Sequence, residues 1–352
     1  MTKVAVVGTV GIPACYGGFE SLVENLTKNA SAGIEYKVFC SSKAYSKKLT
    51  HYNGAELLYF PLNANGAQSI PYDVLSLLRC LIMKPDVVLI LGVSGCIFLP
   101  IFKLLSNCRV VTNIDGLEWK RDKWGKWTKH FLKWSENLAV RYSDVVITDN
   151  HAITEYVEKE YSVSSKTIAY GGDHAVRDIE IEQKSNDYAL ALCRIEPENN
   201  VEMILEAFSQ VHTKLKFIGN WDSSEFGRKL KAKYYNHDNI EIMDPIYDLN
   251  LLFGLRKNCS FYIHGHSAGG TNPSLVEMMH IGVPIFCFDC DFNRYSTQNK
   301  AKYFYDSKDL KYVIEATSIN EYQELSVKMK EIAENKYTWS KICSDYEQTY
   351  VG

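Results

Sequence analysis

The sequence predicts an α/β protein of two doubly wound domains, and three observations lead to that prediction. Short β-rich apolar runs alternate with helical patterns along the chain, which is typical of parallel sheets with crossover helices. The alternation pauses near residues 168–174, a polar stretch follows, and a second series then begins. A chain of 352 residues is also long enough for two domains, each with its own core.

Apolar runs on both sides of the pause are expected to be strands. Those before it are 4–7, 36–40, 86–91, 109–113 and 144–148. Those after it are 188–193, 215–218, 240–243, 261–263 and 284–288. The first run is too short for a signal peptide. The uncharged run 87–102 contains glycine and proline, so we expect a strand, a turn and a helix there and no membrane span.

The composition is that of an ordinary soluble globular protein, with 46% apolar and 23% charged residues. Residues 1–172 hold 19 basic and 15 acidic residues, and the remainder holds 20 and 27, so we expect the two domains to face different partners. Among ten cysteines, Cys287 and Cys290 have C-x-x-C spacing; we interpret them as buried thiols in a reducing cytoplasm. A nucleic-acid partner is disfavoured, because the chain is acidic overall and no known module is present.

The segment 264–277 carries the strongest functional signal. It follows an apolar strand-like run, turns through Gly269 and Gly270, and leads into an apolar helix that Gly282 closes. Such a turn aims backbone N–H groups and the positive end of the helix dipole at an anion. Glu277, about one turn inside the helix, is placed to accept hydrogen bonds from ribose hydroxyls. The segment therefore predicts a nucleotide-sugar site.

This segment resembles the donor site of GT-B glycosyltransferases of family 4, in which two glutamates are separated by seven residues. Glu277 matches the second glutamate, and Gly269 occupies the place of the first. The sequence Gly-Gly-Thr-Asn-Pro-Ser begins at Gly269. It resembles the corresponding segment of a bacterial subfamily of rhamnosyltransferases that build cell-wall and capsular polysaccharides. The match to this subfamily recurs along nearly the whole chain. The resemblance implies a GT-B fold: two Rossmann-like domains, 1–172 on the acceptor side and 173–336 on the nucleotide-sugar side, a cleft between them, and a C-terminal helix, 337–352, that crosses back to the first domain.

The resemblance also implies which residues bind the donor. They are Gly17, Gly18, Arg194, Asn199, Gly269, Gly270, Thr271, Asn272 and Glu277. Arg194 matches an arginine that grips the donor diphosphate, and Asn199 stands where the family has a lysine. The loop with Gly17 and Gly18 lacks the G-x-G-x-x-G spacing of a dinucleotide site, and a structural turn is its alternative. For Arg194 the alternative is a surface ion pair with a nearby glutamate.

The catalytic candidates are Asp115, Glu118 and Arg194. Asp115 lies in Asp-Gly-Leu-Glu-Trp, as in the rhamnosyltransferase subfamily, where other family members have a histidine that contacts the donor sugar. A carboxylate there would stabilise charge at the anomeric carbon or orient the acceptor hydroxyl, and a simple Asp-Gly turn is the alternative. In the family, retention needs no enzymic nucleophile. We expect no cofactor and no metal, and we interpret the Asp-Cys-Asp tripeptide at 289–291 as structural.

Aromatic and basic residues alternate along 119–134. Trp124, Trp127, Phe131 and Trp134 repeat at helical spacing, with lysines between them. Indoles beside lysines suit a membrane interface with anionic lipid, although a core-facing helix with a solvated cationic side is the alternative. The residues expected to contact membrane or acceptor are Trp119, Lys120, Arg121, Lys123, Trp124, Lys126 and Trp127. The protein is thus expected in the cytoplasm, peripheral on the inner face of the cell membrane.

These expectations define a function. It is retaining transfer of a hexose, L-rhamnose from dTDP-β-L-rhamnose, to a polyprenyl-diphosphate-linked sugar in bacterial polysaccharide synthesis. The alternatives are another nucleotide-hexose donor, a GT-B nucleotide-sugar 2-epimerase, and a catalytically silent binding protein. The last is suggested by Gly269 and Asn199, which stand where the family has a glutamate and a lysine.

Overall fold

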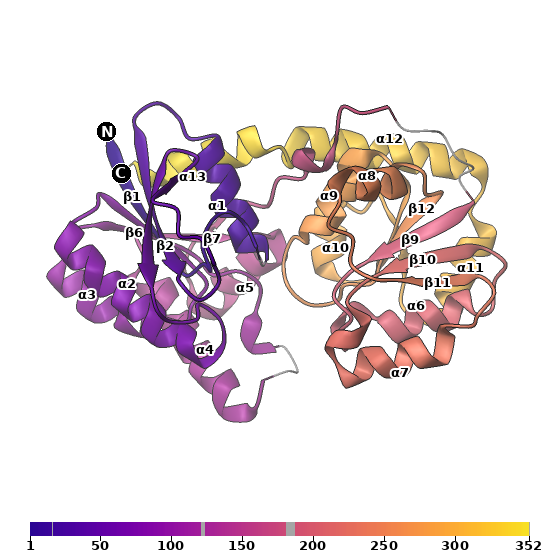
Figure 1. Ribbon diagram of the computed structural model, residues 1–352, viewed down its shortest axis with the longest axis horizontal. Helices are drawn as coiled ribbons and strands as arrows, with labels where there is room; N and C mark the ends of the chain where they lie inside the picture. Colours follow the sequence, from indigo (N-terminus) through magenta and orange to yellow (C-terminus); the bar gives the residue numbers. More distant parts are fainter. Residues whose placement is uncertain (16, 121–123, 181–186, 352) are drawn as a thin grey trace. The chain divides into compact units, whose positions relative to one another are not determined.

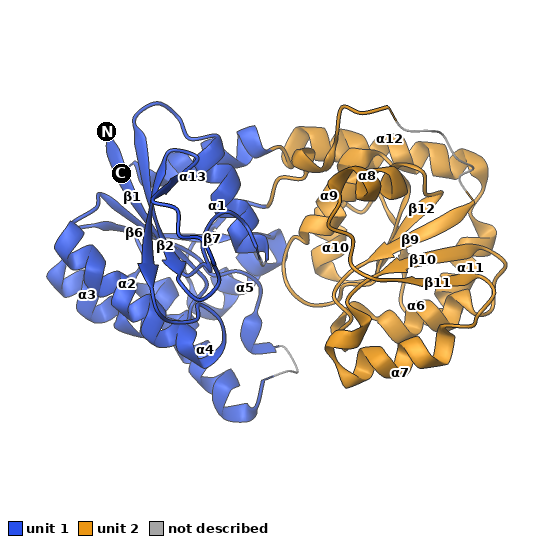
Figure 2. Cartoon of the chain, viewed as in Figure 1, with its two compact units in different colours: residues 1–169, 339–352 blue, residues 170–338 orange. Residues whose placement is uncertain are grey.

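The computed structural model describes residues 1–15, 17–120, 124–180 and 187–351. The chain divides into two compact units, shown in Figure 2. Unit 1 comprises 1–169 and 339–352, and unit 2 comprises 170–338. The sequence predicts the change of domain after residue 172, three residues further along the chain than this division.

Unit 1 is built on an eight-stranded sheet in the order β3-β4-β2-β1-β5-β6-β7-β8. All neighbouring strands are parallel except β3 and β4. The strands are β1 (Thr2–Val7), β2 (Ile34–Ser41), β3 (His51–Tyr52), β4 (Ala55–Phe60), β5 (Val87–Leu91), β6 (Arg109–Asn113), β7 (Val145–Thr148) and β8 (Lys166–Thr167). The helices are α1 (Gly18–Lys28), α2 (Ser69–Met83), α3 (Leu99–Leu105), α4 (Lys126–Tyr142), α5 (His151–Tyr161) and α13 (Trp339–Tyr350).

The helices of unit 1 lie on both faces of this sheet. After β4 the chain crosses the sheet in the opposite direction, so right-handed connections place α1 on one face and α2 to α5 on the other. In Figure 1, α2, α3 and α4 lie together, and α13 lies with α1. The central strands are buried on both sides, which is why β5 is apolar throughout and β1 is apolar over residues 4–7. The C-terminal helix thus belongs to the first unit, as the predicted fold requires.

Unit 2 is built on a six-stranded, fully parallel sheet in the order β11-β10-β9-β12-β13-β14. The strands are β9 (Tyr188–Leu192), β10 (Lys214–Ile218), β11 (Ile240–Met243), β12 (Phe261–His264), β13 (Ile285–Phe288) and β14 (Lys302–Phe304). The helices are α6 (Val201–Phe208), α7 (Glu225–Tyr234), α8 (Leu249–Lys257), α9 (Pro273–Ile281), α10 (Asp291–Ser296), α11 (Ser307–Ala316) and α12 (Ile319–Lys336). The strand order reverses between β9 and β12, and ligands of such sheets bind beyond the carboxyl ends of the strands at that point.

The predicted fold class is confirmed, and the strands that the sequence analysis did not predict lie at or near sheet edges. The strands β3, β8 and β14 have two or three residues each, too few for a periodic signal. The strand β4 is longer, but Glu56 interrupts its pattern and pairs with Lys37 of β2. Pairing with a neighbour, which a single run of sequence does not reveal, makes these segments strands. Among the described residues, no helix is both long and apolar enough to cross a membrane.

Candidate functional site

Two loops at the reversal point of unit 2 are joined by hydrogen bonds. One follows β9 and contains Asn199 and Asn200; the other follows β12 and contains Gly265 and His266. The amide of Asn200 donates to the carbonyl of Gly265 at 2.8 Å, and Oδ1 of Asn199 lies 2.6 Å from Nδ1 of His266. A Cβ on Gly265 would lie 2.3 Å from the carbonyl oxygen of Asn199, so only glycine allows this approach. The loops that the sequence assigns to the donor therefore form one connected structure.

Asn199 lies inside this structure. Its side chain is buried, and its amide also donates to the carbonyl of Arg194 at 2.7 Å. It therefore joins the two loops, and it does not extend toward solvent as a lysine at this position would. The side chain of Arg194 is 58% exposed, and Nη1 lies 3.7 Å from Oε1 of Glu196. Such an exposed pair contributes little, so the guanidinium is available to an anion.

Gly269, which replaces a glutamate of the family, has a conformation that disfavours any side chain. Its φ is +119°, and a Cβ there would lie 2.9 Å from Nε2 of His266. The imidazole of His266 therefore occupies the space beside this backbone. The glycine is required by the present arrangement of the loop.

The N-terminus of α9 is capped by its own chain. Oδ1 of Asn272 accepts a hydrogen bond from the N–H of Ser274 at 2.9 Å, and Pro273 has no N–H to offer. The N–H of Leu275 donates to the carbonyl of Asn272. The N–H groups of Ser274 and Leu275 are thus engaged within the chain. The helix dipole remains, and Gly270 and Thr271 lie in the turn that enters this end of the helix.

Glu277 is held by two basic side chains. Arg256 of α8 donates a hydrogen bond to Oε2 of Glu277, and Nε2 of His174 lies 3.3 Å from Oε1. Burial acts to raise the pKa of Glu277, but Arg256 and His174 together keep this pKa below its usual value. The carboxylate is therefore ionised at neutral pH and has a fixed orientation. Gly172 makes the contact with His174 possible, because a Cβ there would lie 2.6 Å from the backbone of Val276.

Arg256 and His174 were not among the residues predicted from the sequence. Arg256 lies on the buried side of α8 with Leu252 and Phe253. An arginine in register with apolar residues is the signal that would have identified it. His174 lies in the short helix Asp173–Ala175, directly after the pause in the strand pattern.

His264, at the end of β12, is a further buried group of this region. Its side chain is 4% exposed, and Nε2 has no hydrogen-bond partner among the described residues. Burial, with a smaller effect from His266, holds the pKa of His264 well below its usual value. The imidazole is therefore neutral at physiological pH.

In unit 1, the loop between β1 and α1 is organised by the buried carboxylate of Glu20. It accepts hydrogen bonds from the hydroxyl of Thr9 at 2.9 Å, the N–H of Val10 at 2.7 Å and the N–H of Gly17 at 2.8 Å. The backbone donor of Gly17 is therefore engaged, and Gly18 begins α1. This part of the predicted donor loop is ordered by its own acidic residue.

The catalytic candidates Asp115 and Glu118 lie in the turn after β6. Asp115 has a φ of 58°, and its N–H donates to Oδ1 of Asn113 at 2.9 Å. Asn113 in turn donates to the hydroxyl of Tyr346 of α13 at 2.6 Å. Oε1 of Glu118 accepts from the indole of Trp124 at 3.1 Å. Both carboxylates are half-buried and attached to a turn that the C-terminal helix supports.

The predicted membrane segment has two parts with different surroundings. The indole of Trp119 donates to the buried carboxylate of Glu136 at 3.0 Å, and Lys133 lies over the Trp119 ring. These two side chains contact their own unit. Trp127 and Trp134, by contrast, are 91% and 54% exposed on α4.

The remaining basic residues of this segment differ in the same way. Lys120 lies 5.5 Å from the centroid of the Trp119 ring, and Lys126 is exposed at the start of α4. Arg121 and Lys123 lie outside the described residues. On α4, the exposed residues of the predicted stripe include Lys126, Trp127 and Trp134.

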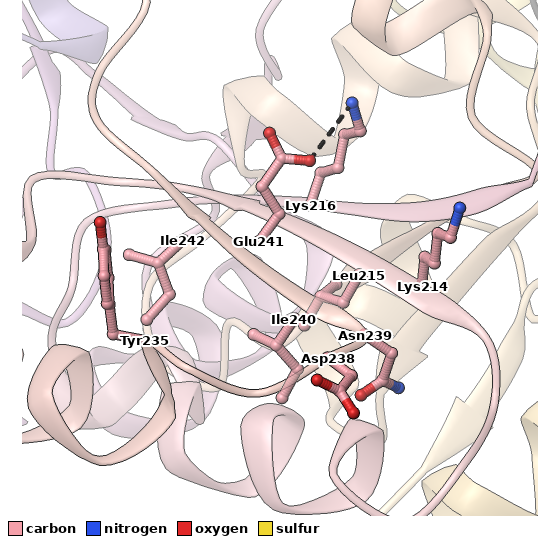
Figure 3. Close-up of a pocket in the computed structure, with 9 residues that line it drawn as sticks. All are labelled: Lys214, Leu215, Lys216, Tyr235, Asp238, Asn239, Ile240, Glu241 and Ile242. Atoms are coloured by element: carbon pink, nitrogen blue, oxygen red, sulfur yellow. Dashed lines mark ion pairs between the residues drawn. The ribbon is translucent and has the colours of Figure 1, made fainter.

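A surface pocket of about 460 Å³ lies elsewhere on unit 2 (Figure 3). It is lined by residues from the beginnings of β10 and β11, where Lys216 pairs with Glu241 at 3.4 Å. Because the strands are parallel, these beginnings lie at the end of the sheet opposite to the loops of the candidate site.

In the described part of the chain, no three acidic, histidine or cysteine side chains are grouped to hold a metal. Asp289 forms two hydrogen bonds with Arg294.

Two family models match the chain, and the boundary between them lies close to the boundary between the two units. Residues 1–173 match a domain of unknown function, DUF1972. Residues 174–337 match the family of glycosyl transferases group 1. The second half of the chain is therefore similar to the group 1 glycosyl transferases. A search of curated proteins finds no match to this chain.

Solved structures share the fold of this chain over nearly its whole length. Sucrose-phosphate synthase from Thermosynechococcus elongatus has a TM-score of 0.81 at 14% identity, with 99% of this chain and 98% of that one covered. Anabaena HepE in complex with UDP has a TM-score of 0.75 at 13% identity, with 99% of each chain covered. A Rickettsia africae glycosyltransferase has a TM-score of 0.73 at 10% identity, with 99% and 97% covered. The two parallel-sheet units therefore have the GT-B fold.

Proposed function

We propose that this chain transfers L-rhamnose from dTDP-β-L-rhamnose to a polyprenyl-diphosphate-linked sugar, with retention at the anomeric carbon. The observation that carries the proposal is Glu277, an ionised and oriented carboxylate inside α9 of a group 1 glycosyltransferase domain. An ionised carboxylate suits as the acceptor of a hydrogen bond from a sugar hydroxyl of the nucleotide, which for a deoxyribose is the 3′-hydroxyl. The Gly-Gly-Thr-Asn-Pro-Ser turn, which resembles the rhamnosyltransferase subfamily, supports the finer assignment of the sugar.

The residues of unit 2 supply donor binding in this proposal. Glu277 accepts from the sugar of the nucleotide, and the exposed guanidinium of Arg194 binds the diphosphate. The dipole of α9 adds favourable potential at the same anion. As the sugar leaves, negative charge grows on the diphosphate, so Arg194 and the dipole stabilise the transition state more than the ground state.

The reaction needs no covalent intermediate. The bond from the anomeric carbon to the diphosphate oxygen breaks, and the acceptor oxygen forms its bond on the same face. The acceptor proton passes to the leaving diphosphate. On unit 1, Asp115 and Glu118 are the proposed residues for orienting the acceptor, and the lipid-linked acceptor places the enzyme at the inner face of the membrane.

A UDP-hexose is a second candidate for the donor, and one of the structural comparisons supports it. HepE has been solved with UDP-glucose at 14% identity to this chain. A UDP-hexose is therefore the alternative donor. A 2-epimerase would instead convert a nucleotide sugar without any acceptor.

The test combines several donors with acceptors of two kinds. The purified protein is incubated with dTDP-L-rhamnose, UDP-glucose or GDP-mannose, and with a bacterial lipid extract or buffer alone. The proposal expects nucleoside diphosphate release and a glycosylated lipid with dTDP-L-rhamnose. Transfer from UDP-glucose alone would show that the donor is a UDP-hexose and not dTDP-L-rhamnose. An epimerised nucleotide sugar formed in buffer alone would show that the protein is an epimerase and not a transferase.

A binding measurement isolates Glu277. Glu277→Gln should weaken dTDP binding by about 1.5–3 kcal/mol in calorimetry, because a hydrogen bond to a charged group is lost. Glu324→Gln, at an exposed position of α12, is the control and should leave binding unchanged. Equal affinity of Glu277→Gln and the parent protein would remove Glu277 from the donor site.

A further inference from the structure

Three neighbouring helices of unit 1 expose an unusual number of large apolar side chains. The helices are α2, α3 and α4, and α3 contacts both of the others. The exposed side chains are Leu75, Leu78, Ile82, Ile101, Leu104, Leu105, Trp127, Trp134 and Tyr142. We call this set the α2–α4 face. Single exposed apolar residues are ordinary, but a contiguous group of them marks an interaction surface.

The exposed stripe is separate from the side of each helix that packs on the sheet. In α2, Tyr72 and Leu77 are buried, whereas Leu78 and Ile82 are 40% and 72% exposed. In α3, Leu99 and Phe102 are buried, and Leu104 is 85% exposed. Both helices are therefore apolar on two sides, which is expected of a helix that is covered on two sides.

The exposed charges within the three helices have one sign; Asp144, just beyond α4, pairs with Lys103 of α3. All residues of the three helices are described, and their acidic residues are Asp73 and Glu136, both buried. The exposed basic residues are Arg79, Lys126 and Arg141, with Lys84 at the end of α2. The surface is thus apolar and cationic, without an exposed carboxylate in its helices.

We propose that the α2–α4 face binds an anionic lipid bilayer. Leucine, isoleucine and tryptophan side chains would enter the region between headgroups and acyl chains, and arginine and lysine side chains would contact the lipid phosphates. Lipid fits better than a second copy of the chain, because two faces whose helices expose basic residues and no carboxylate would repel each other. This surface extends the tryptophan-lysine segment of α4 to two helices, α2 and α3, that the sequence analysis did not single out.

Vesicle binding tests this surface directly. The parent protein is sedimented with vesicles of phosphatidylcholine, or of an equal mixture of phosphatidylcholine and phosphatidylglycerol, as salt is raised. Binding is expected to the anionic vesicles. It should decrease with salt because the Debye length falls to about 8 Å near 0.15 M, and the apolar contacts should leave a salt-resistant part.

Two matched triple variants separate the α2–α4 face from apolar exposure in general. Ile82→Ser, Leu104→Ser and Leu105→Ser together should weaken vesicle partition by about tenfold or more, since each inserted side chain contributes to burial. Tyr312→Ser, Ile319→Ser and Val327→Ser remove comparably exposed side chains of unit 2 and should leave partition unchanged. A third variant, Arg79→Gln with Lys126→Gln and Arg141→Gln, should remove most of the salt dependence.

Three results would overturn the proposal. They are absence of vesicle binding by the parent protein, equal loss in both apolar triple variants, and self-association through the α2–α4 face in analytical ultracentrifugation. Thermal unfolding of each variant establishes that it is folded, and the single variant Leu104→Ser replaces the triple variant if the latter unfolds. The surface does not depend on the identity of the sugar, and loss of vesicle binding with retained transfer to a water-soluble acceptor separates the two proposals.

Discussion

Arg256 of α8 and Glu277 of α9 form an ion pair in which the two side chains are only 8% and 15% exposed. His174 contacts the other carboxylate oxygen of Glu277 at 3.3 Å. The orientation of the proposed nucleotide-binding carboxylate is thus set from two sides, by α8 and by the short helix Asp173–Ala175. Arg256 is a positioning residue, since it acts on the donor through Glu277.

Removal of Arg256 should destabilise unit 2. Arg256→Met leaves Glu277 largely buried without its main cation, and breaking a buried pair in this way costs about 3–5 kcal/mol. Urea unfolding measures this cost. Lys328→Met is the control, because Lys328 pairs with Glu324 at the exposed surface of α12, where a pair contributes about 0.5 kcal/mol.

The double variant Arg256→Met with Glu277→Gln distinguishes pairing from simple packing. It should recover part of the stability that Arg256→Met loses, because no unpaired carboxylate is left. Strict additivity of the two single changes would show that the pair has no energetic significance.

Substitution of Arg194 should impair transfer without unfolding the protein. Arg194→Ala is expected to lower kcat/KM by about 10²–10³-fold, the effect of removing one donor from developing negative charge. Because the guanidinium is exposed, the free energy of unfolding should change by no more than about 0.5 kcal/mol. Arg228→Ala, at an exposed position of α7, is the matched control for kinetics. Activity of Arg194→Ala within a few-fold of the parent would contradict the assignment.

Gly269 and Gly54 offer a paired test of the loop before α9. Both have positive φ, +119° and +77°, but a Cβ on Gly54 would meet nothing within 4 Å, whereas a Cβ on Gly269 would lie 2.9 Å from His266. Gly54→Ala should therefore cost about 1 kcal/mol from backbone strain alone, and Gly269→Ala about 1–3 kcal/mol more. Thermal unfolding compares them. Equal losses would mean that His266 does not restrict the space at Gly269.

Buried His264 should make stability depend on pH below neutrality. Its pKa is lowered well below 6.5 in the folded protein, so between that value and pH 6.5 the unfolded chain binds a proton that the folded protein does not. Stability is therefore unaffected by this group above pH 6.5 and falls as pH decreases below it, by at most about 1.4 kcal/mol per pH unit. Urea unfolding from pH 7.5 to 5 should show this slope.

The His264→Phe variant should show a shallower slope over that pH range. The control is Tyr262→Phe, because Tyr262 lies in β12 with His264. This change removes a hydrogen bond to the carbonyl of Leu192 and should keep the slope of the parent protein. An unchanged slope in His264→Phe would contradict a neutral buried imidazole.

Much of the fold follows from local sequence, because buried parallel strands are continuous apolar runs. The strand β5 is of this kind throughout, as are residues 4–7 of β1 and 261–263 of β12, and Gly8 and Gly282 mark where a strand and a helix end. The edge strands could not be predicted in this way, since their neighbours stabilise them.

The candidate site was predictable only in part. Glu277 and the turn from Gly269 to Asn272 are contiguous in sequence, so a motif identifies them. Arg256 and His174 are distant from Glu277 along the chain, and folding brings them to it. The sequence also cannot show that Asn199 points inward to His266, or that Asn272 occupies the first backbone donor of α9.

Glycosyl transfer by the purified protein tests the account most directly. The measurement is release of nucleoside diphosphate together with a glycosylated product, with dTDP-L-rhamnose and other nucleotide sugars as donors and membrane lipid extract as acceptor. The account predicts transfer with retained anomeric configuration, lost in Arg194→Ala and reduced in Glu277→Gln while both variants stay folded. Transfer that is undiminished in both variants, or no transfer from any nucleotide sugar, would contradict it.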